Sequence, residues 1–137
     1  MCRARCSFLE LLILGILVNE GELHGYALYK RIVDVTQAYW RPSIGTMYRL
    51  LNDMARRGLV SRSLKGRRRS YTVTSRGLEY FIKASKPPLT RKAGVLATVL
   101  EAYFKLAEEN PGIMDEDLKE RLRTLMRVLE EHSNLIE

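Results

Sequence analysis

Residues 42–74 constrain the fold more than any other stretch, because a helical pattern there is followed directly by a strand pattern. Apolar residues recur at helical spacing and predict one buried stripe: Met47, Leu50, Leu51 and Met54. Ser43 is a typical N-cap, and Gly58 stands where a helix ends in a left-handed residue. The sequence therefore predicts a short helix between these two residues.

The opposite face of this predicted helix is polar. It comprises Gly45, Arg49, Asn52, Asp53 and Arg56, with Thr46 and Tyr48 on its flanks. The face begins at the N-terminus of the helix, where backbone amides favour phosphate. It is therefore suited to an anionic partner.

A basic hairpin is predicted directly after this helix. Residues 59–64 and 70–74 have the composition of strands, and the tip between them is Lys65-Gly66-Arg67-Arg68-Arg69. Between Arg41 and Thr72 nine Lys or Arg stand against one Asp, a net charge of +8 compared with +7 for the whole chain. A glycine among cations suits a loop that follows a nucleic-acid backbone or enters a minor groove. A donor-rich helix followed by a basic hairpin predicts a winged helix-turn-helix.

Charge also divides the chain into two regions. With 137 residues and 46% hydrophobic content, it can form one compact domain plus an appended element. Residues 1–85 carry a net charge of +9, whereas residues 86–137 carry −2. We therefore expect a winged helix-turn-helix domain over residues 1–86 and a two-helix dimerisation region over residues 87–137.

The apolar run from Phe8 to Val18 is interrupted by Glu10 and is shorter than the roughly 20 residues that a membrane-spanning helix needs. No small-residue cleavage site follows it. Within the run, Leu11, Leu12, Leu14, Ile16 and Leu17 surround most of a predicted helix over residues 7–18. Such a helix is either fully buried in its own domain or covered partly by a second chain. We expect a cytoplasmic protein with no membrane segment.

Cysteine and histidine are too few and too scattered for a recognisable site. Cys2 and Cys6 are the only cysteines, and His24 and His132 the only histidines. Their spacing matches neither a metal site nor a nucleophile–base pair. We therefore expect no catalytic residue, metal or cofactor, and His24 as a structural residue at a helix start. The two thiols are either reduced or joined to a second chain by a disulfide.

Further helices complete the predicted domain. Residues 24–33 form one, with core or backbone-contact positions at Tyr26, Leu28, Tyr29, Ile32 and Val33, and Trp40 follows as a core or interface anchor. Thr74 can cap another helix over residues 75–83, which would close the core with Leu78, Phe81 and Ile82. Pro87 and Pro88 are predicted to end that helix, because proline lacks a backbone donor.

Two longer helices are predicted in the tail. Residues 90–109 carry a wide apolar stripe made of Val95, Leu96, Val99, Leu100, Tyr103, Phe104 and Leu106. The last helix opens on the acidic residues 115–117, which suit a helix N-terminus. Its heptad seam comprises Leu118, Leu122, Leu125, Leu129, His132 and Ile136. Because so short a coiled coil is marginal alone, we expect Leu118, Leu122, Leu125 and Leu129 to dimerise; the alternative is a helical hairpin within one chain.

Several motifs occur in an order that resembles the PadR-like family of winged-helix transcriptional regulators. They are Leu14-Gly15-Ile16-Leu17, His24-Gly25-Tyr26, Pro42-Ser43-x-Gly45-Thr46-x-Tyr48, Arg57-Gly58-Leu59-Val60, Tyr71-x-Val73-Thr74 and Gly77. The resemblance covers about the first 85 residues. It implies a mainly α fold with a small β-hairpin wing and a C-terminal helical dimerisation element. Arg49 stands where the family often has proline, and Ala27 where it often has an acid.

The resemblance also implies which residues approach DNA. On the predicted helix they are Ser43, Gly45, Thr46, Tyr48 and Arg49, and on the wing Lys65, Arg67, Arg68 and Arg69. We expect a homodimeric, sequence-specific repressor whose two helices enter major grooves about 34 Å apart in an inverted repeat of double-stranded DNA. The alternatives are an architectural protein without sequence preference and a protein-interaction module. A small-molecule effector is implied by the family, but the sequence does not identify one.

Overall fold

The computed structural model describes residues 3–36 and 42–137, with the backbone alone for residues 3–7 and 65. Contacts within the chain divide it into two compact units, and the boundary in the sequence lies between Thr90 and Arg91. Trp40, Arg41, Cys2 and the side chains of Cys6 and Lys65 lie outside the described part, as do the predictions made for them. The elements are α1 (Arg3–Glu20), β1 (Leu23–His24), α2 (Gly25–Thr36), α3 (Ile44–Arg56), β2 (Val60–Lys65), β3 (Arg68–Val73), α4 (Ser75–Glu109), η1 (Pro111–Ile113), α5 (Glu116–Glu131) and η2 (Ser133–Leu135).

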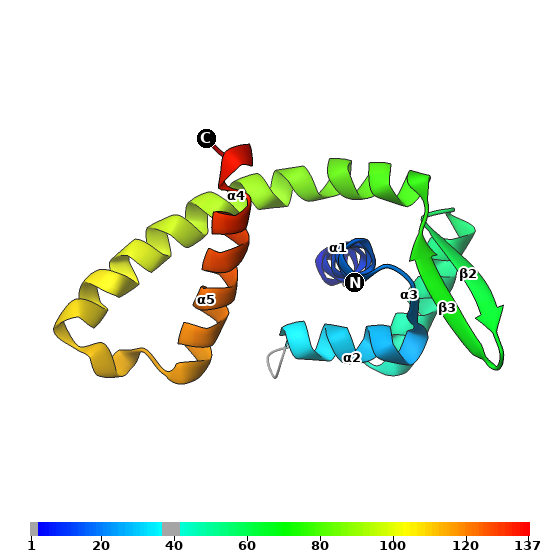
Figure 1. The fold of residues 1–137 in the computed structure, drawn as a ribbon, viewed down its shortest axis with the longest axis horizontal. Coiled ribbons are helices and arrows are strands. Elements are labelled where there is room, and N and C mark those ends of the chain that lie inside the picture. The colour runs from blue at the N-terminus through cyan, green and yellow to red at the C-terminus, as the bar shows by residue number, and fades with distance from the viewer. Residues whose placement is uncertain (1–2, 37–41) are drawn as a thin grey trace. The chain divides into compact units, whose positions relative to one another are not determined.

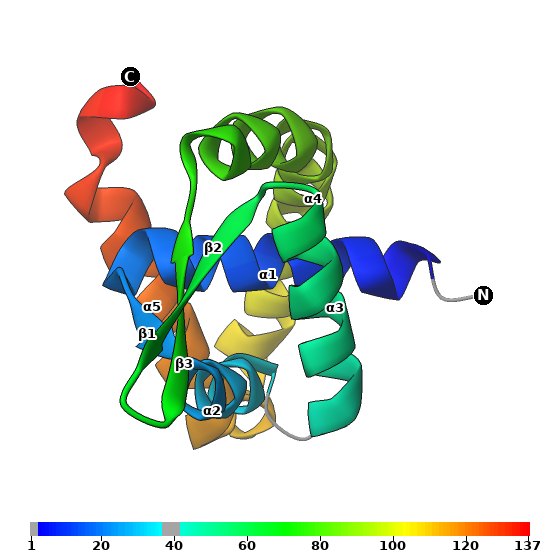
Figure 2. The same ribbon diagram turned by 90° about the vertical axis from the view of Figure 1, so that its right-hand side faces the viewer.

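Helix α1 forms the centre of the first unit. In both views it lies between α2 and the beginning of α4 (Figures 1 and 2). Leu9, Ile13, Leu14 and Leu17 are at most 2% exposed, so most of its apolar surface is buried inside its own chain. Across the described residues no helix is long and apolar enough to cross a lipid bilayer.

The prediction for α3 is confirmed. The Ser43 hydroxyl accepts a hydrogen bond from the Thr46 amide over 3.1 Å and so caps the helix. Met47, Leu51 and Met54 are fully buried and pack into the core formed around α1. Gly58 follows the helix with a φ of 79°, a conformation that costs glycine little.

The wing is the outer part of a three-stranded antiparallel sheet with the order β1-β3-β2. Strand β1 was not predicted: it has two residues, and His24 lies in it rather than in the helix that follows. His24 pairs with Ser70 in β3, and the two side chains lie 3.1 Å apart between Nδ1 and Oγ. This short strand attaches the beginning of α2 to the wing.

The tip of the wing is shorter than predicted. Strand β2 extends to Lys65 and β3 begins at Arg68, so that only Gly66 and Arg67 form the turn. Gly66 has a φ of 66°, which suits a two-residue hairpin turn. Arg68 and Arg69 therefore belong to the strand, whose pairing with β2 fixes their backbone.

Thr74 connects the end of α3 to the beginning of α4. Its hydroxyl caps α4 by accepting from the Gly77 amide over 3.0 Å, as predicted. The same hydroxyl lies 2.6 Å from the carbonyl oxygen of Gly58. A Cβ on Gly77 would lie 2.1 Å from the Leu59 carbonyl oxygen, so α4 can approach this backbone only because residue 77 is glycine.

This close approach corrects the prediction for the core side of α4. Because Gly77 faces Leu59, Leu78 and Ile82 are turned away and are 41% and 68% exposed. Tyr80 and Phe81 pack against the core instead. Of the three predicted core residues, only Phe81 contacts the core.

The prediction that α4 ends at the double proline was wrong. The helix is 35 residues long and includes Pro87 and Pro88. Each proline removes one backbone donor, but its φ near −65° is itself helical, so the chain can continue. The Thr90 hydroxyl donates to the Lys86 carbonyl over 2.9 Å within this stretch.

In the second unit, Asp115 caps α5 by accepting from the Leu118 amide over 2.8 Å. The helix ends at Glu131, so the last two positions of the predicted heptad seam, His132 and Ile136, are not on it. The His132 ring instead lies 2.9 Å from the Val128 carbonyl, which the helix end leaves without an amide donor. None of the α5 side chains is buried.

A carboxylate with only 12% of its side chain exposed joins three helices of the first unit. Glu10 of α1 accepts hydrogen bonds from Arg57, at the end of α3, and from Tyr80 of α4, the latter over 2.8 Å. Arg57 also contacts Asp53 over 2.9 Å. Burial opposes the charge on Arg57, but its bonds to Glu10 raise its pKa. Burial and Glu10 together raise the pKa of Tyr80.

We predict that Glu10→Gln lowers the free energy of unfolding by about 1–3 kcal/mol, because Arg57 loses its less exposed ionic partner. Glu20→Gln is the matched control, since Glu20 contacts Arg31 over 2.9 Å at an exposed position. Its effect should stay within about 0.5 kcal/mol. Urea unfolding followed by far-UV circular dichroism measures both, and equal losses would contradict a special role for Glu10.

Candidate nucleic-acid interface

The N-terminal half of α3 carries an exposed polar row. Thr46 accepts from the Ser43 hydroxyl over 2.8 Å and from the Arg49 guanidinium over 3.4 Å, which aligns the three side chains along one face. Gly45 is exposed beside them, and a Cβ there would meet nothing within 4 Å. Four of the residues predicted to approach DNA therefore lie together, on the first two turns of the helix.

Tyr48 is positioned differently from this row. It is partly buried, packs against the core, and lies across the first residue of α2. A Cβ built on Gly25 would be 2.4 Å from the Tyr48 hydroxyl oxygen and 2.6 Å from the nearest ring carbon. Glycine at position 25 therefore allows the ring to lie where it does.

Tyr71 of β3 connects α3 to the wing. Its side chain is fully buried. Burial, followed by the neighbouring Tyr48, raises the pKa of the Tyr71 phenol, and Arg69 opposes this rise. Tyr48 of α3 and Arg69 of β3 thus both act on the buried ring of Tyr71.

Several of the cations counted in the sequence stabilise the fold. Arg56 contacts Asp53 over 3.2 Å, and Arg57 is bound by Glu10 and Asp53. Arg62 of β2 donates to the Asn52 side chain over 2.6 Å, which fastens the wing to α3. These three guanidinium groups are held by partners within the chain.

Three other cations of the wing, Arg67, Arg68 and Arg69, line a cleft between the hairpin and α2. Its volume is about 640 Å³, and its walls are His24, Gly25, Tyr26, Ala27, Lys30, Tyr48, Arg67, Arg68 and Arg69. The tip of the hairpin lies beside the beginning of α2 in both ribbon views (Figures 1 and 2). Tyr48 is thus the wall that this cleft shares with α3.

Lys30 was not identified from the sequence, and Tyr26 was considered only as a core or backbone-contact position. Tyr26 is 62% exposed, and the Lys30 ammonium lies 5.9 Å from the centroid of its ring. Both residues reach the wing because β1 pairs with β3. A two-residue strand has no periodic pattern, so the sequence carried no signal for this arrangement.

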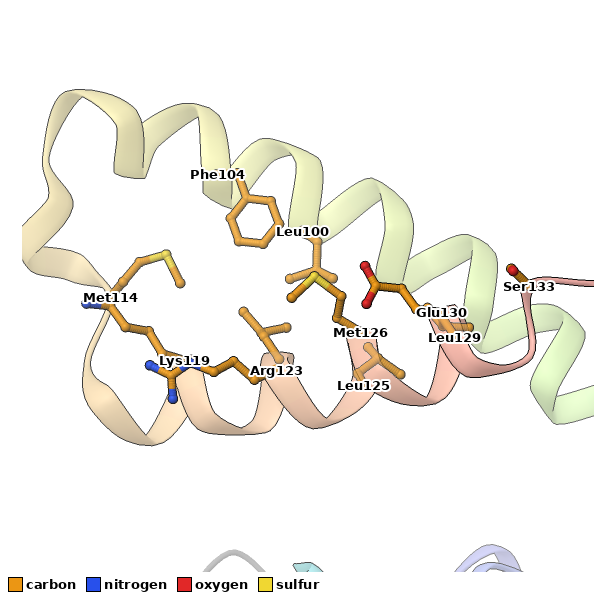
Figure 3. Close-up of a pocket in the computed structure, with 11 residues that line it drawn as sticks. Leu100, Phe104, Met114, Lys119, Arg123, Leu125, Met126, Leu129, Glu130 and Ser133 are labelled. Atoms are coloured by element: carbon orange, nitrogen blue, oxygen red, sulfur yellow. The ribbon is translucent and has the colours of Figure 1, made fainter.

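The predicted dimerisation residues lie in the second unit. An apolar groove of about 550 Å³ separates α5 from the end of α4, where Leu100 and Phe104 face Leu125 and Met126 (Figure 3). Leu122, Leu125 and Leu129 line this groove. Leu118 is partly buried and lies outside its walls.

We predict that Gly25→Ala costs about 1–3 kcal/mol of stability, because the added methyl group displaces Tyr48. In a Tyr48→Ala background the same change should cost less than about 0.5 kcal/mol, since the nearest obstacle is then absent. Urea unfolding of the two single variants, the double variant and the wild type measures this coupling. Equal costs in both backgrounds would show that another group causes the strain.

Comparison with known proteins agrees with this fold. The family model described as "Transcriptional regulator PadR-like family" matches residues 13–83, just over half of the chain. A search of curated proteins with this sequence finds no match. A solved transcriptional regulator from Clostridium thermocellum is 24% identical with a TM-score of 0.58, over 68% of this chain and 92% of that one.

Two further solved structures share the fold. A PadR family transcription regulator from Clostridium difficile is 21% identical with a TM-score of 0.55, over 68% of this chain and 98% of that one. RosR from H. salinarum is 21% identical with a TM-score of 0.53, over 87% of this chain and 88% of that one. With a basic wing and a family model that matches more than half of its length, the chain belongs to the PadR-like family of transcriptional regulators.

Proposed function

We propose that this chain is a homodimeric repressor that binds an inverted repeat in double-stranded DNA. The observation that carries the proposal is the meeting of two surfaces at Tyr48. One is the exposed row that ends at Arg49, and the other is the cleft lined by the wing arginines. A helix with exposed donors suits base edges in a major groove, and neighbouring cations suit the phosphates beside it.

Each surface has its own task in this proposal. Arg49 and Thr46 lie on the exposed face of α3, where side chains of a recognition helix reach base edges. Arg67 to Arg69 contact phosphates, which position the protein without reading sequence. If each protomer neutralises about four or five phosphates, the dimer neutralises about eight to ten, and its affinity should fall by roughly 10⁴- to 10⁵-fold between 50 and 200 mM salt.

The second unit supports the homodimer. Helix α5 has 16 residues and buries none of them, and an isolated helix of that length is marginal. Large apolar side chains of both helices are exposed in the single chain, among them Val95, Val99, Leu106, Met126 and Leu129. A second copy would cover these side chains and fill the groove between α4 and α5.

A small-molecule effector stays a proposal drawn from the family. Of the two aromatic residues in the tail, Phe104 lines the apolar groove. The hydroxyl of Tyr103 donates to the Ile113 carbonyl over 2.8 Å, so this side chain connects α4 to η1. An apolar ligand would therefore contact Phe104 first.

Selection of bound duplexes from a random pool tests the proposed function. We expect enrichment of one palindromic site, and binding to that site at least a hundredfold tighter than to random duplex.

Arg49→Ala should change the preferred base at one position in each half-site. Replacing Arg67, Arg68 and Arg69 together by Ala should weaken binding to every duplex and flatten the salt dependence. Equal affinity for all duplexes would instead identify an architectural protein.

We predict that Leu122→Asp combined with Leu125→Asp converts the dimer into a monomer, because two charges would enter the apolar interface. Sedimentation equilibrium measures the mass, and circular dichroism checks that the first unit stays folded. Leu64→Asp is the matched control, since Leu64 is 68% exposed on the wing. A double variant that stays dimeric would place the interface elsewhere.

A further inference from the structure

We propose that the cleft between α2 and the wing is a second DNA-binding element, in which Lys30 and Tyr26 hold the sugar–phosphate backbone against Arg67 to Arg69. This inference rests on the proposed function and extends it to Lys30 and Tyr26 of α2. The cleft lies beside the recognition helix, so one duplex could contact both surfaces.

The charge of the cleft indicates an anionic ligand. Four cations line it, Lys30 from α2 and Arg67, Arg68 and Arg69 from the wing, and no carboxylate is among its walls. Like charges gathered in one cleft repel one another unless an anion is bound between them. The ligand that relieves this repulsion must carry several negative charges.

Three cations outside the cleft are paired with carboxylates. Arg31, one residue after Lys30, contacts Glu20 over 2.9 Å. Arg56 and Arg57 contact Asp53, and Arg57 contacts Glu10 as well. Carboxylates thus accompany the cations at these three positions, whereas no carboxylate lies among the residues that line the cleft.

The shape of the cleft favours a chain of phosphates over a single ion. Its volume of about 640 Å³ is far larger than one phosphate group. The Tyr26 ring is 62% exposed, and the Lys30 ammonium lies 5.9 Å from its centroid, which orients the cation by a cation–π contact. The phenol can donate to a phosphate oxygen beside the ammonium group. Successive phosphates on one strand could then be bound by α2 and by the wing.

Such contacts give affinity and register without sequence preference, because every nucleotide carries the same phosphate. Lys30 should therefore act uniformly on all duplexes, whereas Arg49 should act on particular bases. The same phosphate chemistry is also present in free nucleotides, and the experiment has to separate the two sources.

Binding of Lys30→Ala to the selected operator tests the inference, with Lys83→Ala as the matched control for loss of one exposed charge outside the cleft. We expect Lys30→Ala to bind roughly three- to tenfold more weakly at low salt, with a salt slope reduced by about 1 for each protomer. Lys30→Arg should restore affinity, and the order of preference among operator variants should not change. Affinity and slope equal to those of Lys83→Ala would overturn the inference.

Ethylation interference gives a second readout. In the wild type, ethylation of the phosphates bound in the cleft should weaken binding, and Lys30→Ala should lose interference at those phosphates while keeping it elsewhere. An unchanged interference pattern would contradict the assignment. Inorganic tripolyphosphate is the probe for a free anion: tight binding that needs Lys30, combined with unchanged operator binding by Lys30→Ala, would make the cleft a free-anion site.

Failure of the proposed function looks different. A protein that binds no duplex at any salt concentration would defeat the regulator itself, and Lys30 would have nothing to influence. A protein that binds an operator with full strength despite Lys30→Ala would defeat only the assignment of the cleft.

Discussion

One carboxylate, that of Glu10, joins three helices of the first unit, α1, α3 and α4. It lies in the central helix and accepts hydrogen bonds from the end of α3, through Arg57, and from α4, through Tyr80. A buried charge is costly unless it is paired and hydrogen-bonded, so the arrangement is favourable only when all three helices are in place. The position of α3 thus depends on a contact at its C-terminal end, whereas its exposed polar row lies on the first two turns.

Two glycines allow close contacts between other elements of the first unit. Gly77 lets α4 approach the Leu59 carbonyl, and this rotates α4 so that Tyr80 points toward Glu10. Gly25 leaves room for the Tyr48 ring, which fixes the distance between α2 and α3. At both positions a Cβ would lie less than 3 Å from a neighbouring atom. Gly25 and Tyr48 both line the cleft beside the wing, so this contact sets the width of the cleft there.

Local patterns explain which parts of this fold could be predicted. The α3 helix and the wing were predictable because caps, spacing and turn residues all lie within a few residues of one another, as with Ser43 and Gly58. Strand β1 was missed because it exists only through pairing with a strand almost fifty residues later. The double proline misled the prediction because proline weakens a helix without forbidding it.

The candidate site shows the same division. The row on α3 follows from periodicity, and Ser43, Thr46 and Arg49 do lie together. Composition alone could not tell which arginines hold the fold, because that depends on Glu10 and Asn52, residues distant in the chain. Lys30 could not be identified from the sequence either, because the arginines beside it in the cleft come from the wing, far along the chain.

The proposed roles of the cations, phosphate contacts for those of the wing and cleft and base contacts for Arg49, explain why a dimer would be needed. In the proposed function the wing and the cleft bind phosphates, which give affinity for any duplex and do not distinguish one sequence from another. Discrimination would then depend on the few exposed side chains on the first two turns of α3, which can reach only a few base pairs. Two such helices, held at a fixed separation, would double the number of bases read. A second copy that packs on the apolar side chains of α5, none of which is buried in the single chain, would supply this separation in the proposed homodimer.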